Sequence, residues 1–510
     1  MKVFRKTSNP IIFYTIILLE VLVKFVCLIT TEIYMTLRSL CIHAHFYQPP
    51  REDPLTGIIP KEAGAAPYFN WNERIHAECY RPNAERSNFE NISFNIGPTL
   101  IPWMSSHDPN TWRKIVEQDQ ANLRRYGVGN AIAQPYNHTI LPLSTYQDAV
   151  TQVKWGIVDF EHRFGRKPQG MWLPETAVNL ETLSILSSQG IEFTILAPWQ
   201  ADQEDIDVTK PYRVNLPNGR SIFVFFYHGE LSGGISFNSG MTINADGFAE
   251  FELATRFNPR KVQSGEPQLV VIATDGELYG HHQPNRDQFL AHLVNGAVHR
   301  LDIQPTFPGL WLNEHKVRDS VQIKENTSWS CHHGLGRWLG KCSCTTGDTS
   351  WKSQLRYALE RISQAIDNLY IETLEQDIAN PRTLIDRYIH VMLGSISAEE
   401  FIQEAASRML PSERIVQIHL LLEAQRERQR MFTSCGWFFD DFDRIEPKNN
   451  LAYAAQAVRL IKLATGLDLE PYVIRDLSKV ISPRTNLRAD RLFRYYLERA
   501  VKDGRVVASE

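Results

Sequence analysis

The chain has 510 residues, of which 43% are hydrophobic and 22% are charged. This length and composition exclude a peptide or a single small binding module and are typical of a folded protein with two or more domains. The 54 Lys and Arg residues nearly balance 58 Asp and Glu residues, and the net charge of −4 leaves no basic surplus to neutralise a nucleic-acid backbone. We therefore expect no nucleic-acid partner and a neutral or weakly charged substrate.

The seven cysteines are odd in number and sparse for this length. Secreted proteins that depend on disulfides carry more cysteines, usually in even number. We therefore expect reduced thiols in a cytoplasmic protein.

An apolar run near the N-terminus, Ile11–Leu19, follows three basic residues, as in a signal peptide or a membrane anchor. Glu20 and Lys24 interrupt the hydrophobic pattern, and charges are costly inside a bilayer. We expect residues 1–34 to lie outside the functional fold, through a start codon assigned too far upstream. The alternative is a genuine anchor, and only that alternative predicts membrane association.

Residues 35–345 alternate short β-rich runs with helical patterns, which is typical of βα units around a parallel sheet. The runs expected as strands are 40–46, 92–96, 130–134, 169–173, 192–197, 221–227 and 268–274. The stretches expected as helices between them include 111–126, 146–163 and 180–189. Seven units favour a barrel over an open sheet, so the expected fold class is α/β. No glycine-rich nucleotide motif follows the first strand, and a nucleotide cofactor is unsupported.

The remainder, residues 346–510, is poor in glycine and carries apolar residues at helical spacing. The predicted helices are 351–376, 382–393, 411–430, 448–464 and 486–502. We expect an α-helical domain here.

Histidines, aromatic residues and carboxylates gather where the predicted barrel strands end. They are His43, His45 and Gln48 after the first strand, His138 after the third, Trp172 and Glu175 after the fourth, and Asp275 and His281 after the seventh. Because the carboxyl ends of barrel strands meet at one face, Glu175 and Asp275 are expected to face one cavity. The roughly 40 residues after the first strand show no clear helix, and such a length favours a lid over that cavity.

A facing carboxylate pair is what glycosidic bond cleavage requires, because one acid protonates the leaving oxygen while the other attacks or activates water. Either acid alone is more often a helix cap or part of a surface ion pair. Trp172 and Pro174 present Glu175 rigidly, and Gly276 beside Asp275 allows a ligand to approach the backbone closely. Glu277 is the rival for the acid role, and we expect it to brace a neighbouring loop instead.

Five segments, HAHFYQPP, NHTILPL, WLPE, DGELYGHH and SWSCHHGLGRW, resemble in this order the five motifs of the family 57 glycoside hydrolases, which act on α-glucans. The resemblance covers residues 39–345, and the helical remainder resembles the C-terminal region of one poorly characterised branch. It implies a distorted seven-stranded (β/α) barrel followed by a helical domain. It also implies a retaining mechanism without a metal or other cofactor.

The resemblance implies that Glu175 is the nucleophile and Asp275 the general acid/base. The residues implied to bind the substrate are His43, His45, Gln48, His138, Trp172, His281, Trp329, His333 and Trp338. The implied substrate is an α-glucan or a maltooligosaccharide. Hydrolysis, chain transfer and branching share one covalent intermediate, and the sequence leaves the choice among them open.

Two other function classes stay open. Paired histidines and an aspartate at strand ends also describe a metal-dependent polysaccharide hydrolase or deacetylase. Glu175 has no ligand role in that chemistry, and the first strand lacks an acidic ligand. A non-catalytic glucan-binding protein is the third class, and the presence of both carboxylates favours an enzyme over it.

A cluster of soft ligands, Cys331-His332-His333 followed by Cys342-Ser343-Cys344, lies in and just beyond the fifth motif. Its spacing differs from the usual paired CxxC of zinc sites. Reduced thiols are the favoured interpretation, with a structural metal and a redox disulfide as alternatives.

Overall fold

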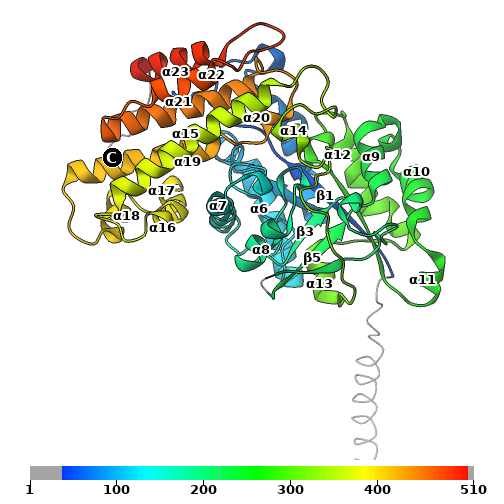
Figure 1. Cartoon of the computed structure of the whole chain (residues 1–510). Helices are drawn as coiled ribbons and strands as arrows, with labels where there is room; N and C mark the ends of the chain where they lie inside the picture. Colours follow the sequence, from blue (N-terminus) through cyan, green and yellow to red (C-terminus); the bar gives the residue numbers. More distant parts are fainter. Residues whose placement is uncertain (1–36, 218, 504–510) are drawn as a thin grey trace, which may run out of the picture.

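The computed structural model describes residues 37–217 and 219–503 (Figure 1). The expectations for residues 1–34 fall outside the described residues. Within the described ranges, no helix is both long and apolar enough to cross a membrane.

Two small sheets form the centre of the first part of the chain. In one, β1 (Arg38–Phe46) lies between the parallel strands β2 (Ser93–Ile96) and β6 (Gln268–Asp275), and the short β7 (Gln304–Pro305) pairs with the start of β1. In the other, β3 (Phe193–Leu196) is parallel to β5 (Ser221–Phe226), and β4 (Tyr212–Asn215) adds an antiparallel edge. The expected α/β class is confirmed.

Isolated parallel bridges connect the two sheets. Phe94 pairs with Ala131, Ala133 with Met171, and Gly170 with Phe193. On the opposite side, the backbone N–H of His228 donates to the carbonyl of Val271 at 2.7 Å. Five of the seven expected strands are therefore regular strands, whereas 130–134 and 169–173 form single bridges, and a regular seven-stranded barrel is not confirmed.

Side chains of β1 alternate between two environments, as the two-residue period of a strand requires. The even-numbered apolar residues belong to a core cluster shared with the surrounding helices. Cys41 belongs to a second cluster, together with alternate residues of β6. His43 and His45 continue the face of Cys41, and Asp275 continues the matching face of β6. The pleat of two neighbouring strands thus brings these three side chains to the same inner surface.

Helices surround the sheets. The longer ones are α6 (Pro109–Tyr126), α7 (Tyr146–Phe164), α8 (Leu180–Ser188) and α9 (Gly229–Phe237). The shorter ones are α2 (Trp71–Ile75), α3 (Arg81–Glu85), α4 (Asn88–Asn91), α5 (Ile101–His107), α10 (Ala245–Gly247), α11 (Pro259–Gln263), α12 (Arg286–His292), α13 (Pro308–Glu314) and α14 (Gly336–Leu339). The three expected helices are confirmed as α6, α7 and α8. Each begins at a polar N-cap residue whose side chain accepts a hydrogen bond from a backbone N–H of the first turn. The three N-caps are Asp108, Thr145 and Asn179.

The expectation of a long segment without a clear helix after the first strand is wrong for residues 71–91. Here α2, a π-helical turn η2 (His76–Tyr80) and α3 follow one another, and α4 comes next. Asn70 caps the segment by accepting the backbone N–H of Glu73 at 2.9 Å. A π-turn inserts an extra residue and shifts the hydrophobic register, which hides the regular helical period from sequence analysis.

The second part of the chain consists of helices that lie along one side of the first part, yellow to red in Figure 1. They are α15 (Trp351–Leu374), α16 (Pro381–Arg387), α17 (Ile389–Met392), α18 (Ala398–Ala405), α19 (Ser412–Arg430), α20 (Cys435–Phe438), α21 (Ile445–Thr465), α22 (Glu470–Leu477) and α23 (Ala489–Asp503). All five predicted helices are present, with 382–393 divided into α16 and α17.

Helix α7 joins the two parts. The buried Trp155 of α7 belongs to the core of the helical part and donates its indole N–H to the carbonyl of Ile385 at 3.0 Å. Arg428 of α19 forms a bidentate ion pair with the Asp148 carboxylate of α7, with N–O distances of 2.9 and 2.5 Å. Arg428 is 2% exposed. The Arg428 guanidinium is among the groups that hold the pKa of Asp148 below its ordinary value against the effect of burial.

We predict that Arg428→Met lowers the free energy of unfolding by about 3–5 kcal/mol, because it leaves a buried carboxylate without its cation. Arg113 pairs with Glu117 at 3.7 Å, with side chains 66% and 59% exposed, so the matched change Arg113→Met is expected to cost less than about 1 kcal/mol. Urea unfolding of both variants measures the difference. Equal losses would contradict this account of the junction.

Candidate active site

Three neighbouring strands place polar side chains side by side. His45 of β1 is in register with Asn95 of β2 on one side and with Asp275 of β6 on the other. His43 lies one step back along the same face of β1. The sequence therefore builds this row from the alternation of strand side chains alone.

Glu175 follows the bridged segment 169–173, inside the short 3-10 helix η4 (Pro174–Thr176). Glu175 and Thr176 both have positive φ angles, 58° and 48°. This conformation costs an L-residue about 1–2 kcal/mol, and such strain gathers at functional sites. The backbone N–H of Trp329 donates to the Glu175 carbonyl at 3.0 Å and holds the turn in place.

Two donors fix the Glu175 carboxylate. The indole Nε1 of Trp329 donates to Oε2 at 2.9 Å, and the hydroxyl of Ser330 donates to the same oxygen at 2.7 Å. No side chain in the described part of the chain bonds Oε1, which remains available for attack on a substrate. Burial raises the pKa of Glu175 above its ordinary value, while Ser330, Trp329 and the charge of Arg337 oppose the rise.

Asp275 ends β6 with its side chain exposed to solvent. Even so, the protein atoms around the carboxyl raise its pKa to about 7, and the negative charge of Glu175 is the second cause. The two carboxylates therefore lie close enough to repel one another. This asymmetry, with one acid held by donors and the other poised near neutral pH, is the arrangement that acid–base catalysis uses.

Glu277 is 3% exposed and accepts hydrogen bonds from the Tyr80 hydroxyl at 2.5 Å, the backbone N–H of Tyr47 at 3.2 Å and the Gln48 amide at 3.4 Å. Burial raises the pKa of Glu277 to about 8. It ties the loop after β1 to the helical segment that contains Tyr80, as expected of a bracing residue. Its burial leaves Asp275 as the acid that solvent reaches.

The three strand-end histidines form one hydrogen-bonded chain through Asn95. We assign its protons from the donors and acceptors present. The Asn95 amide donates to Nδ1 of His45 at 2.9 Å, and Nε2 of His45 donates to Nε2 of His138 at 3.1 Å. Nε2 of His43 donates to Oδ1 of Asn95 at 3.2 Å, and Nδ1 of His43 accepts from the Ser93 hydroxyl at 2.9 Å. Every bonded nitrogen has its complement, so the chain is consistent with neutral imidazoles.

Burial favours the same neutral state. It lowers the pKa of His43 to about 3 and of His45 to about 4, and lowers that of His138 well below its ordinary value. Because the ring nitrogens bond to one another and to side-chain partners, they do not converge on a common metal position as a deacetylase-type site would need. The histidine row therefore acts as a hydrogen-bonded wall.

The helical part of the chain reaches this wall. Nδ1 of His138 donates to the hydroxyl of Ser434 at 2.6 Å, and the backbone N–H of Ser434 donates to the His138 carbonyl at 3.0 Å. The next residue, Cys435, lies close enough to Glu175 for the glutamate charge to raise the thiol pKa, after burial as the larger cause. Sequence analysis did not identify Ser434 as a residue that contacts the site.

Of the aromatic residues expected to bind substrate, Trp172 and Trp338 are both fully buried, whereas Trp329 is partly exposed. Trp172 stacks against His43 and His45, with ring centroids 4.8 and 5.1 Å away, and contacts Trp329 edge to face. Trp338 lies in the core of the helical part, near Phe438. Neither Trp172 nor Trp338 has a face open to a sugar, and this burial corrects the expectation of sugar contact for both.

The remaining expected residues lie around the row. The Gln48 amide forms a hydrogen bond with Glu277, and Nδ1 of His281 forms one with the Glu78 carboxylate at 2.5 Å. His333 turns its Nδ1 toward the thiols of Cys342 and Cys344 at 3.4 Å each, so its ring is engaged in the cysteine cluster. Gly276 also differs from expectation: the Phe46 ring fills the space where its Cβ would stand, at 2.4 Å, so its small size serves packing and not a ligand.

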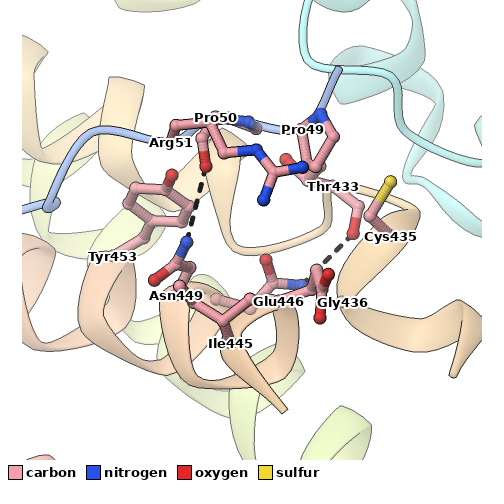
Figure 2. A pocket seen from close by; sticks show the side chains of 11 residues that line it. Pro49, Pro50, Arg51, Thr433, Cys435, Gly436, Ile445, Glu446, Asn449 and Tyr453 are labelled. Atoms are coloured by element: carbon pink, nitrogen blue, oxygen red, sulfur yellow. Dashed lines mark hydrogen bonds between the residues drawn. The ribbon is translucent and has the colours of Figure 1, made fainter. Parts of the chain in front are cut away.

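Two cavities lie beside the row, where the loop after β1 meets the helical part. Figure 2 shows the smaller one, where Pro49, Pro50 and Arg51 face Cys435 and helix α21, and the Asn449 amide donates to the Pro50 carbonyl at 3.5 Å. The larger one has a volume of about 740 Å³. Its polar lining includes Asn137, Glu423, Arg426, Glu427 and Arg430, so it adjoins His138 through Asn137.

Comparison with known proteins gives two family matches. A model described as Glycosyl hydrolase family 57 matches residues 45–324, more than half of the chain. A model described as Domain of unknown function (DUF3536) matches residues 348–509. None of the curated proteins matches the chain at a significant level.

Several solved structures share the fold at low sequence identity. An exo-type maltose-forming amylase from Pyrococcus sp. ST04 is 17% identical, with a TM-score of 0.71, covering 86% of this chain and 83% of its own. For a GH57-type branching enzyme from Pyrococcus horikoshii the identity is 16%, the TM-score 0.56 and the coverages 91% and 94%. A 4-alpha-glucanotransferase from Thermococcus litoralis is 15% identical, with a TM-score of 0.53, and the match covers 83% of this chain and 60% of the glucanotransferase. At these low identities, the TM-scores establish a shared fold and nothing further.

The raised pKa of Asp275 predicts a pH-dependent gain in stability for Asp275→Asn. An aspartate whose native pKa is raised stabilises the fold below its unfolded pKa of about 3.9, and this contribution is lost as the pH rises through about 7. Asp275→Asn should therefore melt at a higher temperature than the wild type at about pH 8, and the gain should shrink toward about pH 5.

Asp302→Asn is the matched control, because the Asp302 side chain is 94% exposed. Its effect on the melting temperature should be small, because an exposed surface carboxylate contributes little to stability. A pH-independent effect of Asp275→Asn in calorimetry would contradict the assigned environment of this carboxyl.

Proposed function

From the premise that the chain belongs to glycosyl hydrolase family 57, we propose that it is a retaining enzyme that cleaves α-glucans or maltooligosaccharides through a covalent glycosyl-enzyme intermediate. Glu175 is the nucleophile and Asp275 the general acid/base. The observation that carries this assignment is the pair itself: Glu175 is held by two donors on one oxygen, and its charge raises the pKa of a solvent-accessible Asp275.

In the first step, Oε1 of Glu175 attacks the anomeric carbon of an α-linked glucose unit as Asp275 gives its proton to the departing glycosidic oxygen. A pKa of about 7 means that Asp275 carries this proton in a large share of molecules at neutral pH. The hydrogen bonds from Trp329 and Ser330 hold the carboxylate in line for attack. The product of this step is a β-linked ester on Glu175.

In the second step, Asp275, now a carboxylate, takes a proton from water or from a sugar hydroxyl, and that oxygen attacks the anomeric carbon and releases the Glu175 carboxylate. Two inversions restore the α configuration. The neutral histidine row forms an uncharged wall on one side of the site, because its ring nitrogens are already hydrogen-bonded to one another and to Ser93, Asn95 and Ser434. Ser434 orients His138, so the helical part takes part in forming the site.

The structural neighbours support an α-glucan substrate. Their names describe a maltose-forming amylase, a branching enzyme and a 4-alpha-glucanotransferase. The cavity of about 740 Å³ falls within the range of roughly 300–1,000 Å³ of ligand sites, and its lining includes Asn137, the chain neighbour of His138, but neither Glu175 nor Asp275. Whether water or a sugar hydroxyl is the acceptor distinguishes a hydrolase from a transferase.

The proposal extends to architecture and location. The seven parallel segments, including the bridged 130–134 and 169–173, form the wall of a distorted barrel within a catalytic unit at residues 35–345. Residues 346–510 form the helical domain. The sparse, odd-numbered cysteines support a cytoplasmic enzyme with reduced thiols.

Azide rescue tests the two roles. Glu175→Ala and Asp275→Ala should each lower turnover of maltooligosaccharides by at least about 100-fold. Azide should then react in place of the missing carboxylate in Glu175→Ala and give a β-glycosyl azide. For Asp275→Ala, the substrate should carry an activated leaving group that needs no acid, so that the ester on Glu175 still forms. Azide should then attack the anomeric carbon of this intermediate and give an α-glycosyl azide. The anomer is read by nuclear magnetic resonance.

Glu181→Ala, an exposed change in the first turn of α8, is the control and should retain wild-type turnover. An α-azide from Glu175→Ala, or full activity of either variant, would refute the role assignment. The same assays resolve products by length and branch content: shorter chains indicate hydrolysis, and longer or newly branched chains indicate transfer. Absence of wild-type turnover on maltooligosaccharides and glycogen would refute the substrate class.

A further inference from the structure

We infer that Cys331, His333, Cys342 and Cys344 form a tetrahedral zinc site that fixes the loop carrying Trp329 and Ser330 against Glu175. The four ligand atoms, three thiol sulfurs and Nδ1 of the histidine, lie within 4.8 Å of one another. The metal site itself stands on this geometry. Its effect on catalysis rests on the proposed function of Glu175.

The distances agree with a single ion at the centre of the cluster. Zn–S bonds near 2.3 Å and Zn–N bonds near 2.0 Å place two sulfurs about 3.7 Å apart, and a sulfur and a nitrogen about 3.5 Å apart, in a tetrahedron. The Cys331 and Cys342 sulfurs are 3.6 Å apart. Nδ1 of His333 lies 3.4 Å from the sulfur of Cys342 and 3.4 Å from that of Cys344.

The ligand chemistry selects zinc. Three thiolates and one imidazole form one of the common structural zinc sets, whereas Ca²⁺ and Mg²⁺ prefer oxygen ligands. An iron–sulfur cluster contains two or more iron ions and needs its ligands spread around a larger body. Four ligand atoms within 4.8 Å surround one ion and leave no room for such a cluster.

The chain around the cluster is folded to present these four atoms. Two short turns each supply two ligands separated by one residue, Cys331 with His333 and Cys342 with Cys344. Gly334 has a positive φ of 72°, and a side chain there would strike the Asn326 carbonyl at 2.4 Å, so this turn requires glycine. Cys331 and Cys342 are only 5% and 7% exposed.

The charge around the cluster also fits. Three thiolates and a neutral imidazole leave a net charge of −1 on a zinc site. Arg337 donates to the Cys344 carbonyl at 2.7 Å, and Lys352 donates to the Arg337 carbonyl at 3.0 Å. Two cationic side chains therefore adjoin the site. Lys352 belongs to α15, so the cluster also lies against the first helix of the helical part.

The link to Glu175 is direct in the chain. Trp329 and Ser330, whose side chains hold Oε2 of Glu175, immediately precede Cys331. A metal bound at Cys331 limits the motion of both donors, whereas a loop of free thiols has only weak contacts among its sulfurs. The zinc is thus a positioning element, with no contact to the substrate.

Metal analysis tests the site in the full-length protein, purified under reducing conditions and passed over a chelating resin. We expect about one zinc per chain. Exchange with Co²⁺ should give the intense visible bands of tetrahedral cobalt together with thiolate-to-metal charge transfer. Zinc removal by a strong chelator should lower kcat, and Zn²⁺ but not Mg²⁺ should restore it.

Matched variants identify the ligands. Cys342→Ser and His333→Ala should lose most of the bound zinc, while the neighbouring exposed changes His332→Ala and Ser343→Ala should keep it. His333→Cys, which creates a four-cysteine set, should retain zinc and stay folded by circular dichroism. Glu175→Gln should be inactive but keep its zinc. Its activity tests the proposed function and its zinc content tests the metal site, so the failure of one can be told from the failure of the other.

Three results would overturn the inference. The first is reduced wild-type protein that binds neither zinc nor cobalt. The second is equal zinc content in Cys342→Ser, His333→Ala and the two controls. The third is a Cys331–Cys342 disulfide in protein purified without added oxidant, identified by mass spectrometry after alkylation. If Cys342→Ser and His333→Ala fail to fold, the wild-type cobalt spectrum decides, because only thiolate ligation gives the charge-transfer bands.

Discussion

The different environments of two carboxylates, Glu175 and Asp275, are the constraint on which the site depends. The two acids come from segments that are distant in sequence, burial raises the pKa of both, and the charge of Glu175 raises the pKa of Asp275 further. The cost of ionisation is reduced in different ways for the two acids. Glu175 receives two hydrogen bonds on Oε2, whereas Asp275 remains free to hold a proton and open to solvent. On that difference in environment rests our proposal that Glu175 is the nucleophile and Asp275 the acid.

The surrounding structure holds this pair from three directions. The pleat of β1 and β6 brings Asp275 beside His45. The loop around Trp329 supports Glu175, whose turn has an unfavourable backbone conformation. Ser434 from the helical part completes the histidine row through His138. Because that contact and the Arg428–Asp148 pair both cross the junction, the helical part stabilises the site as well as the fold.

The sequence was informative where short-range periodicity or motif order carries the information. The alternation of β-rich runs with helical patterns predicted β1 and the helices α6, α7 and α8. Both carboxylates could be chosen because each ends a predicted strand segment. The resemblance in the five motifs agrees with the family match over residues 45–324.

What the sequence could not supply depends on contacts between distant residues. His138 and Ser434 are 296 positions apart, and no local pattern pairs them. Trp338 lies in a motif that favoured sugar contact, but its burial depends on packing against Phe438. The π-turn in residues 76–80 disturbed the helical period of its segment. The bridges at 130–134 and 169–173 show that β-rich composition fixes where strands run and not how regularly they pair.

The most direct test of the central claim is to trap the ester that the pair should form. Wild-type enzyme is incubated with a slow fluorinated α-glucosyl fluoride, digested, and analysed by peptide mass spectrometry. The account predicts one glucosyl label, on the peptide containing Glu175, with the attachment mapped to that side chain. A label on Asp275 or Glu277 in place of Glu175 would contradict it.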